Sequence, residues 1–201
     1  MLMCKIDWGL TINALTLIAV GIGAWKGIKE LQRAQKWKKA EFLGNEYKSF
    51  INNDYIQKAF SILDGFLLNI PFTNKDGEAA VICYTKDKLK KALTNIHANK
   101  QKNRTYEPDA ESTNIRLYID KFLFRLGAFQ AHIESELIDK DSLKPYILYW
   151  LNLMTDMEDD TIDIQTKQVI FKYIIDNKLY SLIKLFRNYE LPIPGSENIQ
   201  V

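Results

Sequence analysis

The first pattern along the chain is an apolar run from Trp8 to Trp25 that contains no ionisable side chain. As an α-helix this run would be about 27 Å long, close to the ~30 Å hydrocarbon core of a bilayer. Its two tryptophans lie at the ends, where indole rings favour the headgroup boundaries. The pattern predicts a transmembrane helix over residues 8–25, with Trp8 and Trp25 as interface anchors.

Two other interpretations of this run are open. Gly21 and Gly23 offer a small-x-small site for cleavage of a signal peptide, but the segment before the run is nearly neutral and lysines follow it. A buried core helix is usually shorter and lacks bracketing tryptophans. A membrane anchor explains the pattern best.

Helical periodicity continues beyond the run. Residues 26–50 contain no proline, so the span is predicted to extend into a stalk. Asn53 and its neighbours can begin a new helix, because asparagine and aspartate side chains accept hydrogen bonds from free amides. Its apolar positions are Ile56, Phe60, Leu63, Leu67 and Ile70, and Pro71 ends it. We expect a loop over 71–77 and a further helix over 78–96, although 80–85 also fits a short strand.

The clearest stripe lies after a polar loop over residues 97–113. It comprises Ile115, Ile119, Phe122, Leu126, Phe129, Ile133 and Leu137, the spacing of a helix packed in a bundle. Asp141 or Ser142 is expected to cap the next helix, whose apolar positions run from Leu143 to Met157. An acidic turn over 158–163 then leads to a last helix over 165–189.

These patterns predict an all-α protein with one N-terminal transmembrane helix that continues into a cytoplasmic helical bundle. The expected segments are a short extracytoplasmic N-terminus (1–7), the span (8–25), a basic juxtamembrane stalk (26–51), a cytoplasmic α-helical domain (52–190) and an extended tail (191–201).

Basic residues determine the expected orientation. The net charge is only +2, but the cations directly after the span are Lys26, Lys29, Arg33, Lys36, Lys38 and Lys39. By the positive-inside rule the N-terminus faces out and the following domain is cytoplasmic, in a single-pass inner-membrane protein. The same cations attract anionic lipid, or they form a partner-binding surface together with Trp37.

Small and polar residues share one stripe of the span, namely Asn13, Thr16, Ala19, Gly23 and Gly27. Small residues let two backbones approach closely in lipid, and asparagine can donate a hydrogen bond between helices. The stripe predicts that the protein is a homo-oligomer. An inert anchor and a pore lined by Asn13 and Thr16 are the alternatives.

Catalytic chemistry is not indicated by the sequence. It contains no phosphate-binding loop, nucleophile elbow or set of metal ligands at the usual spacing, so no catalytic residue, metal or cofactor is predicted. His132 and Glu136 share a helix face, a pair that is commonplace on protein surfaces. The acidic residues from Asp156 to Asp163 lack the spacing of a calcium loop and are interpreted as a solvated turn.

A second charged region is the one candidate for an anionic ligand. Its residues are Tyr84, Lys90, Lys91, Lys100, Lys102, Arg104 and Tyr106. Cations interleaved with aromatic rings can hold phosphates and stack bases, so a nucleotide or single-stranded RNA is conceivable. A solvated helix face followed by a loop is the simpler interpretation.

The chain resembles a group of small bacterial single-span membrane proteins classed as a domain of unknown function. The likeness is carried by GAWKGIKELQRAQKWKK, where the span enters a basic helix, and by the aromatic-rich FLFRLGAFQAHIESELIDKDSLKPYI. Some similar proteins act as membrane effectors of antiviral systems, and one such class binds cyclic oligoadenylate. The resemblance implies a role in defence and transfers no ligand contact to this chain.

The function expected from these features is a membrane-anchored, non-enzymatic, oligomeric effector or scaffold with a lipid bilayer and a further protein as partners. The alternative is a cytoplasmic-face sensor of a nucleotide or other anionic ligand that gates or disrupts the membrane through its span.

Overall fold

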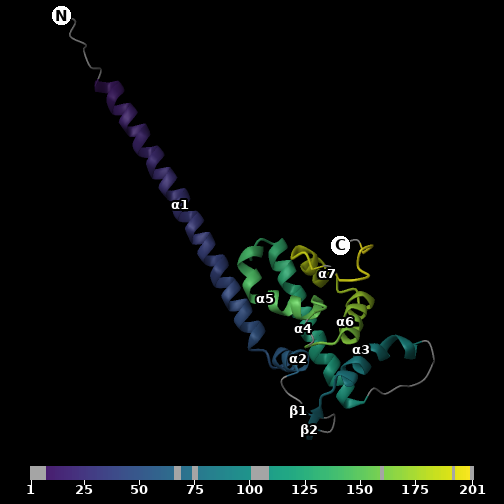
Figure 1. Ribbon diagram of the computed structural model, residues 1–201. Helices are drawn as coiled ribbons and strands as arrows, with labels where there is room; N and C mark the ends of the chain where they lie inside the picture. Colours follow the sequence, from purple (N-terminus) through teal and green to yellow (C-terminus); the bar gives the residue numbers. More distant parts are fainter. Residues whose placement is uncertain are drawn as a thin grey trace, which may run out of the picture. The chain divides into compact units, whose positions relative to one another are not determined.

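The structure is a computed structural model that describes residues 8–65, 69–73, 77–100, 109–158, 161–191 and 193–199, without the side chains of residues 8–15, 18 and 95–100. Over these residues the chain forms seven helices and two strands (Figure 1). They are α1 (Trp8–Ile51), α2 (Asp54–Asp64), β1 (Asn69–Thr73), β2 (Ala79–Cys83), α3 (Lys86–Lys100), α4 (Ala110–Glu134), α5 (Lys140–Thr155), α6 (Ile164–Asp176) and α7 (Tyr180–Asn188).

The chain divides into two compact units, residues 1–42 and 43–201. The division falls inside α1, within the predicted stalk. The first unit is helical throughout its described part, and every described side chain from Thr16 to Glu41 is exposed. The last turns of α1 belong to the second unit, where Leu43 and Phe50 are buried.

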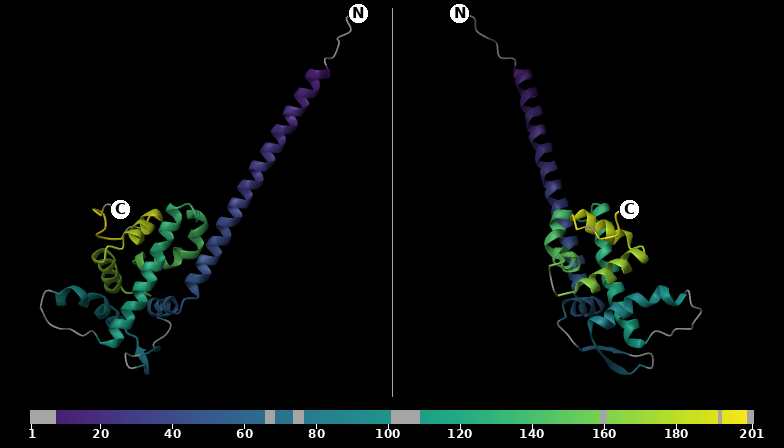
Figure 2. Two further views of the ribbon diagram at one scale, coloured as in Figure 1. Left: turned by 180° about the vertical axis from the view of Figure 1, so that it is seen from behind. Right: turned by 45° about the vertical axis from the view of Figure 1, so that its right-hand side comes forward.

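Helix α4 runs through the middle of the second unit (Figure 2). It packs against α2, α3 and α7. The predicted stripe is buried from Ile115 through Phe129. Phe122 lies in an aromatic cluster in which the rings of Phe60 and Trp150 stack with their centroids 3.8 Å apart. Because aromatic side chains bury large apolar areas, this cluster is a major part of the core.

Side-chain caps begin five of the described helices, including α3, where the Thr85 hydroxyl oxygen accepts a hydrogen bond from the Lys88 amide at 3.2 Å. Asn53 accepts hydrogen bonds from the first amides of α2, and Asp109, Asp139 and Asp163 do the same for α4, α5 and α6. The sequence indicated residues 52–54 together as the start of this helix, and Asn53 is the residue that caps it. The prediction for α5 was wrong, because Asp139 caps this helix and Ser142 donates its backbone amide to that carboxylate at 3.0 Å.

The prediction of a mostly helical protein is confirmed, but it is not purely α. Helix α2 ends at Gly65, whose φ of 67° is the left-handed conformation that favours glycine. The chain then forms β1 and β2, which pair antiparallel with Ile70 opposite Ile82 and Phe72 opposite Ala80. Residues expected to extend α2 and to begin the next helix therefore form a hairpin.

The last predicted helix is two helices. Lys178 has a φ of 56°, and this left-handed residue separates α6 from α7. The segment after α7 was expected to be extended, yet its described residues form turns. Ile193 is buried there, and Arg187 donates hydrogen bonds to the carbonyl oxygens of Ser196 and Ile199. These contacts hold the segment against the helices.

In the part of the chain that the structure describes, no helix combines the length and apolarity needed to cross a membrane. The predicted span is only partly included, since the side chains of residues 8–15 and 18 lie outside the described residues.

Gly127 sets how closely α4 and α7 pack. A Cβ atom at this position would lie 3.2 Å from the backbone nitrogen of Leu182. We expect Gly127→Val to lower the free energy of unfolding by about 1–3 kcal/mol, because α7 would have to move away. Urea unfolding followed by circular dichroism measures the change. Ala128→Val, on a less buried neighbouring position, is the matched control and should change stability much less; equal effects would contradict the close-packing argument.

Candidate functional site

The predicted assembly stripe is located on an exposed helix. Thr16, Ala19, Gly23 and Gly27 all lie on α1 and are exposed, and a Cβ atom added to either glycine would meet nothing within 4 Å. The side chain of Asn13 lies outside the described residues. Among the described residues, therefore, no close contact requires glycine at position 23 or 27.

Large apolar side chains are exposed around the same part of α1. They include Leu17 (74% exposed), Val20 (64%), Ile22, Trp25, Ile28 and Leu31. The ammonium of Lys29 lies 3.8 Å from the centre of the Trp25 ring, at the point where apolar sequence gives way to basic sequence. The other predicted lipid-facing cations, Lys26, Arg33, Lys36, Lys38 and Lys39, are exposed as well. The side chain of Trp8 lies outside the described residues.

The structure places the described lysines of the predicted anionic-ligand site against carboxylates. Lys91 lies 2.8 Å from Asp109, and Lys90 lies 3.4 Å from Asp163. Tyr84 is buried, and burial together with the nearby charge of Asp163 raises its pKa to about 12. The side chain of Lys100 and all of Lys102, Arg104 and Tyr106 lie outside the described residues.

These ion pairs connect separate elements. Asp109 caps α4 and binds a lysine of α3, and the Lys91 hydrogen bond followed by that of the Ser112 amide lowers the pKa of Asp109 to about 2. Burial raises the pKa of Asp163, but hydrogen bonds from Thr166 and Lys90 outweigh it and bring the value to about 2. The two lysines therefore contribute to holding α3 against the starts of α4 and α6.

His132 does not use Glu136 as its partner. Its Nε2 atom lies 3.8 Å from the carboxylate of Glu46 on α1, within the second unit. Glu136 lies beyond the end of α4 with a φ of 57° and is exposed. The described residues contain no group of three or more His, Cys, Asp or Glu side chains that could hold a metal ion.

The end of α5 is held from inside the core by Lys167, a residue that the sequence patterns did not single out. Lys167 is fully buried, and its Nζ atom donates a hydrogen bond to the carbonyl oxygen of Asp156, the residue that ends α5. A cation at a helix C-terminus interacts favourably with the helix dipole. The position of Lys167 on the buried face of a helix was the available signal.

The largest cavity among those described here, about 600 Å³, lies between the hairpin, α2 and α4. The rings of Tyr55 and Tyr118 are 6.0 Å apart in its wall. Lys58 and Asp54 also line it, but they form an ion pair with each other at 2.7 Å. The cavity thus offers aromatic faces without an uncompensated charge.

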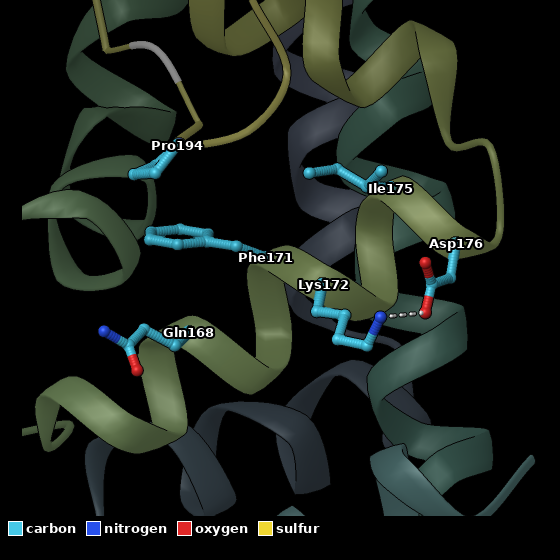
Figure 3. Close-up of a pocket in the computed structure, with 6 residues that line it drawn as sticks. All are labelled: Gln168, Phe171, Lys172, Ile175, Asp176 and Pro194. Carbon is cyan, nitrogen blue, oxygen red and sulfur yellow. Dashed lines mark ion pairs between the residues drawn. The ribbon is translucent and has the colours of Figure 1, made fainter. Parts of the chain in front are cut away.

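A smaller cavity of about 250 Å³ lies between α6 and the C-terminal segment (Figure 3). Phe171 and Pro194 face each other across it, and Ile175 lies nearby. The ion pair between Lys172 and Asp176, 3.1 Å long, lies at its edge. This cavity therefore lies at the contact between α6 and the C-terminal segment.

A third cavity, of about 370 Å³, is an apolar groove between α4 and the turn from α6 to α7. Phe124 in its wall is 70% exposed.

No protein family, curated protein or solved structure matches this chain. Among the described residues, two exposed apolar surfaces stand out, one on α1 and one beside Phe124.

The pairing of Asp109 and Asp163 predicts a specific acid sensitivity. Both pKa values are about 2 in the folded chain, below the unfolded value of about 3.9, so these carboxylates stabilise the fold above pH 4. That stability is lost as the pH falls from about 4 to 2. Asp109→Asn with Asp163→Asn should flatten the dependence of urea unfolding on pH in this window. Asparagine still caps helices, so the helices should form at neutral pH. Exposed Asp141→Asn is the control, and an unchanged slope in the double variant would contradict the assignment.

Proposed function

We propose that this protein is a membrane-anchored, non-enzymatic effector or scaffold that works as a homo-oligomer. In this proposal α1 is the anchor, and the second unit is a helical domain on the cytoplasmic side of a bacterial inner membrane. The resemblance to membrane effectors of antiviral systems favours the effector over a passive scaffold.

The exposed apolar surface of α1 carries this proposal. Burying one Leu, Ile or Val side chain is worth about 1.5–3 kcal/mol, and Leu17, Val20 and Ile22 all stand in solvent. Exposing these side chains to water therefore carries a free-energy cost, and a bilayer removes that cost along the whole apolar run. The tryptophan and lysine at its basic end, Trp25 and Lys29, match the residues that anchor a helix at the headgroups.

The alternative of an anionic-ligand sensor at Lys90 and Lys91 has less support. Each lysine already lies against an aspartate, so a ligand would have to compete with those ion pairs. The absence of catalytic motifs in the sequence is the reason for proposing a non-enzymatic role.

The anchor is tested by placing charge within the predicted span. The full chain should remain in bacterial membranes during alkaline carbonate extraction, whereas Leu17→Lys with Ile22→Lys should be released. A lysine at the centre of the span, as at position 17, costs about 2.5–3.5 kcal/mol of insertion free energy, and one nearer the end, as at position 22, adds a smaller cost. The matched control is Leu31→Lys with Trp37→Lys, two exposed apolar positions of the same helix beyond the span.

Wild-type protein in the carbonate supernatant would refute the anchor, as would equal release of the two double variants. Orientation is read in the same cells from Cys83, which is exposed. In a Cys4→Ser chain, a membrane-impermeant maleimide should label Cys83 only after the inner membrane is opened. Labelling of intact spheroplasts would reverse the proposed topology.

Assembly through α1 is tested at its glycines. Gly23→Leu with Gly27→Leu should lower the particle mass in nanodiscs or detergent, because the leucines would keep a second helix from approaching closely. A Cβ atom at either position meets nothing within 4 Å among the described residues, so a loss of mass reports on contacts between chains. Gly21→Leu, equally open but on another face, is the control. An unchanged mass for the double variant would remove this stripe as the assembly surface.

A further inference from the structure

The groove beside Phe124 is a slot between α4 and the turn that leads into α7, and the structure describes every residue that lines it. Gly127 forms part of its base, where a Cβ atom would lie 3.2 Å from the backbone nitrogen of Leu182. The lining positions on α4 run from Leu123 to Ala131, which is about 12 Å of helix. The groove therefore extends along two turns of α4, with the exposed Phe124 ring in its wall.

The two sides of the groove differ in chemistry. Every lining residue that α4 contributes is apolar. The polar members of the lining are Lys178, Tyr180 and Ser181, which are exposed and come from the turn between α6 and α7 and the first residues of α7. A ligand in this groove would meet an apolar surface along α4 and polar groups on the opposite side.

Lys178 gives the polar side a positive charge. The lining includes no acidic residue, and among the described residues Lys178 forms no ion pair. In this respect it differs from Lys90 and Lys91, each of which lies against an aspartate. The groove is therefore complementary to a molecule that is apolar along most of its length and carries a negative charge.

The volume of the groove distinguishes between possible occupants. At about 370 Å³ it lies within the ~300–1,000 Å³ range of small-molecule sites. It is more than twice the size of the ~150 Å³ cavity that holds a benzene ring, so one side chain from another protein would leave most of it empty. A flexible acyl chain can follow a slot of this length and needs no polar partner along it.

We propose that the groove beside Phe124 binds a single-chain anionic amphiphile such as a fatty acid, with the acyl chain along α4 and the carboxylate at Lys178. Binding removes the Phe124 ring from water, and the release of that apolar surface is the driving force. The inference goes beyond the proposed function, because it requires neither insertion nor assembly of α1. It gives the helical domain a ligand site separate from the region of Lys90 and Lys91.

The test is photolabelling of the full chain in phospholipid nanodiscs. Two probes carry the same diazirine-bearing acyl chain, and one ends in a carboxylate while the other ends in a trimethylammonium group. The carboxylate probe should label the peptides that contain residues 123–131 and 178–182, and excess dodecanoate should abolish this labelling. Since phospholipid is present in excess, labelling of the groove reports a preference for the single-chain amphiphile over bilayer lipid.

Charge reversal at Lys178 tests the position of the carboxylate. Lys178→Glu should lower groove labelling by the carboxylate probe about three- to tenfold and raise labelling by the trimethylammonium probe. Lys121→Glu makes the same change of charge at an exposed α4 position outside the lining, and it should alter neither. Comparing variants with one probe removes the effect of probe partitioning into lipid.

Filling the groove tests the position of the acyl chain. Ala131→Phe adds a ring at an exposed lining position and should lower labelling by both probes at least about tenfold, because part of the apolar contact is lost. Ala34→Phe, at an exposed position of α1, should leave groove labelling unchanged. Circular dichroism verifies that each variant is folded.

Three results would overturn the proposal. They are absence of groove labelling in the folded wild type, as expected if a second copy or another protein covers the groove, labelling that dodecanoate does not compete, and equal effects of Lys178→Glu and Lys121→Glu. Carbonate extraction and particle mass report on the anchor and on assembly through α1, so failure of this proposal is distinguishable from failure of the proposed function.

Discussion

The second unit depends on the burial of α4. Its apolar positions face the aromatic cluster of Phe50, Phe60 and Trp150 on one side, and Gly127 admits the backbone of α7 on another. Since protein interiors are close-packed, moving α4 would disturb α2, α3 and α7 together. The same close approach at Gly127 leaves the groove beside Phe124, so one packing constraint determines both the core and the surface next to it.

Helix positions were predictable where burial follows a single face. The stripe from Ile115 to Phe129 has the helical period, and the structure buries it as expected. The predicted helix boundaries were wrong where the local backbone conformation determines them. Gly65 and Lys178 adopt left-handed conformations that end α2 and α6, and apolar periodicity carries no information about them. Only one possible strand, over 80–85, was noted from the sequence, and β1 was not predicted, because alternation over five residues is too short to identify a strand.

The candidate sites show a different limit of sequence reasoning. A cluster of lysines indicates an anionic ligand only if those lysines lack partners within the fold. Lys91 meets Asp109 and Lys90 meets Asp163, which is far away in the sequence, so the neutralising carboxylates become evident only in three dimensions. Met157 shows the opposite error, because a residue that was expected to be buried is exposed. It was assigned to the apolar face of α5, but that helix ends at Thr155 and leaves the methionine exposed in the acidic turn.

The two units differ in the burial of their large apolar side chains. Among the described residues of the second unit, most large apolar side chains are buried, and the exposed ring of Phe124 is one of the exceptions. In the described part of the first unit, exposure of large apolar side chains is the rule from Leu17 to Leu31. Water disfavours such an exposed apolar surface. The proposed membrane anchor and the proposed assembly through Gly23 and Gly27 would each remove this surface from water, and for that reason the two proposals rest on the same helix.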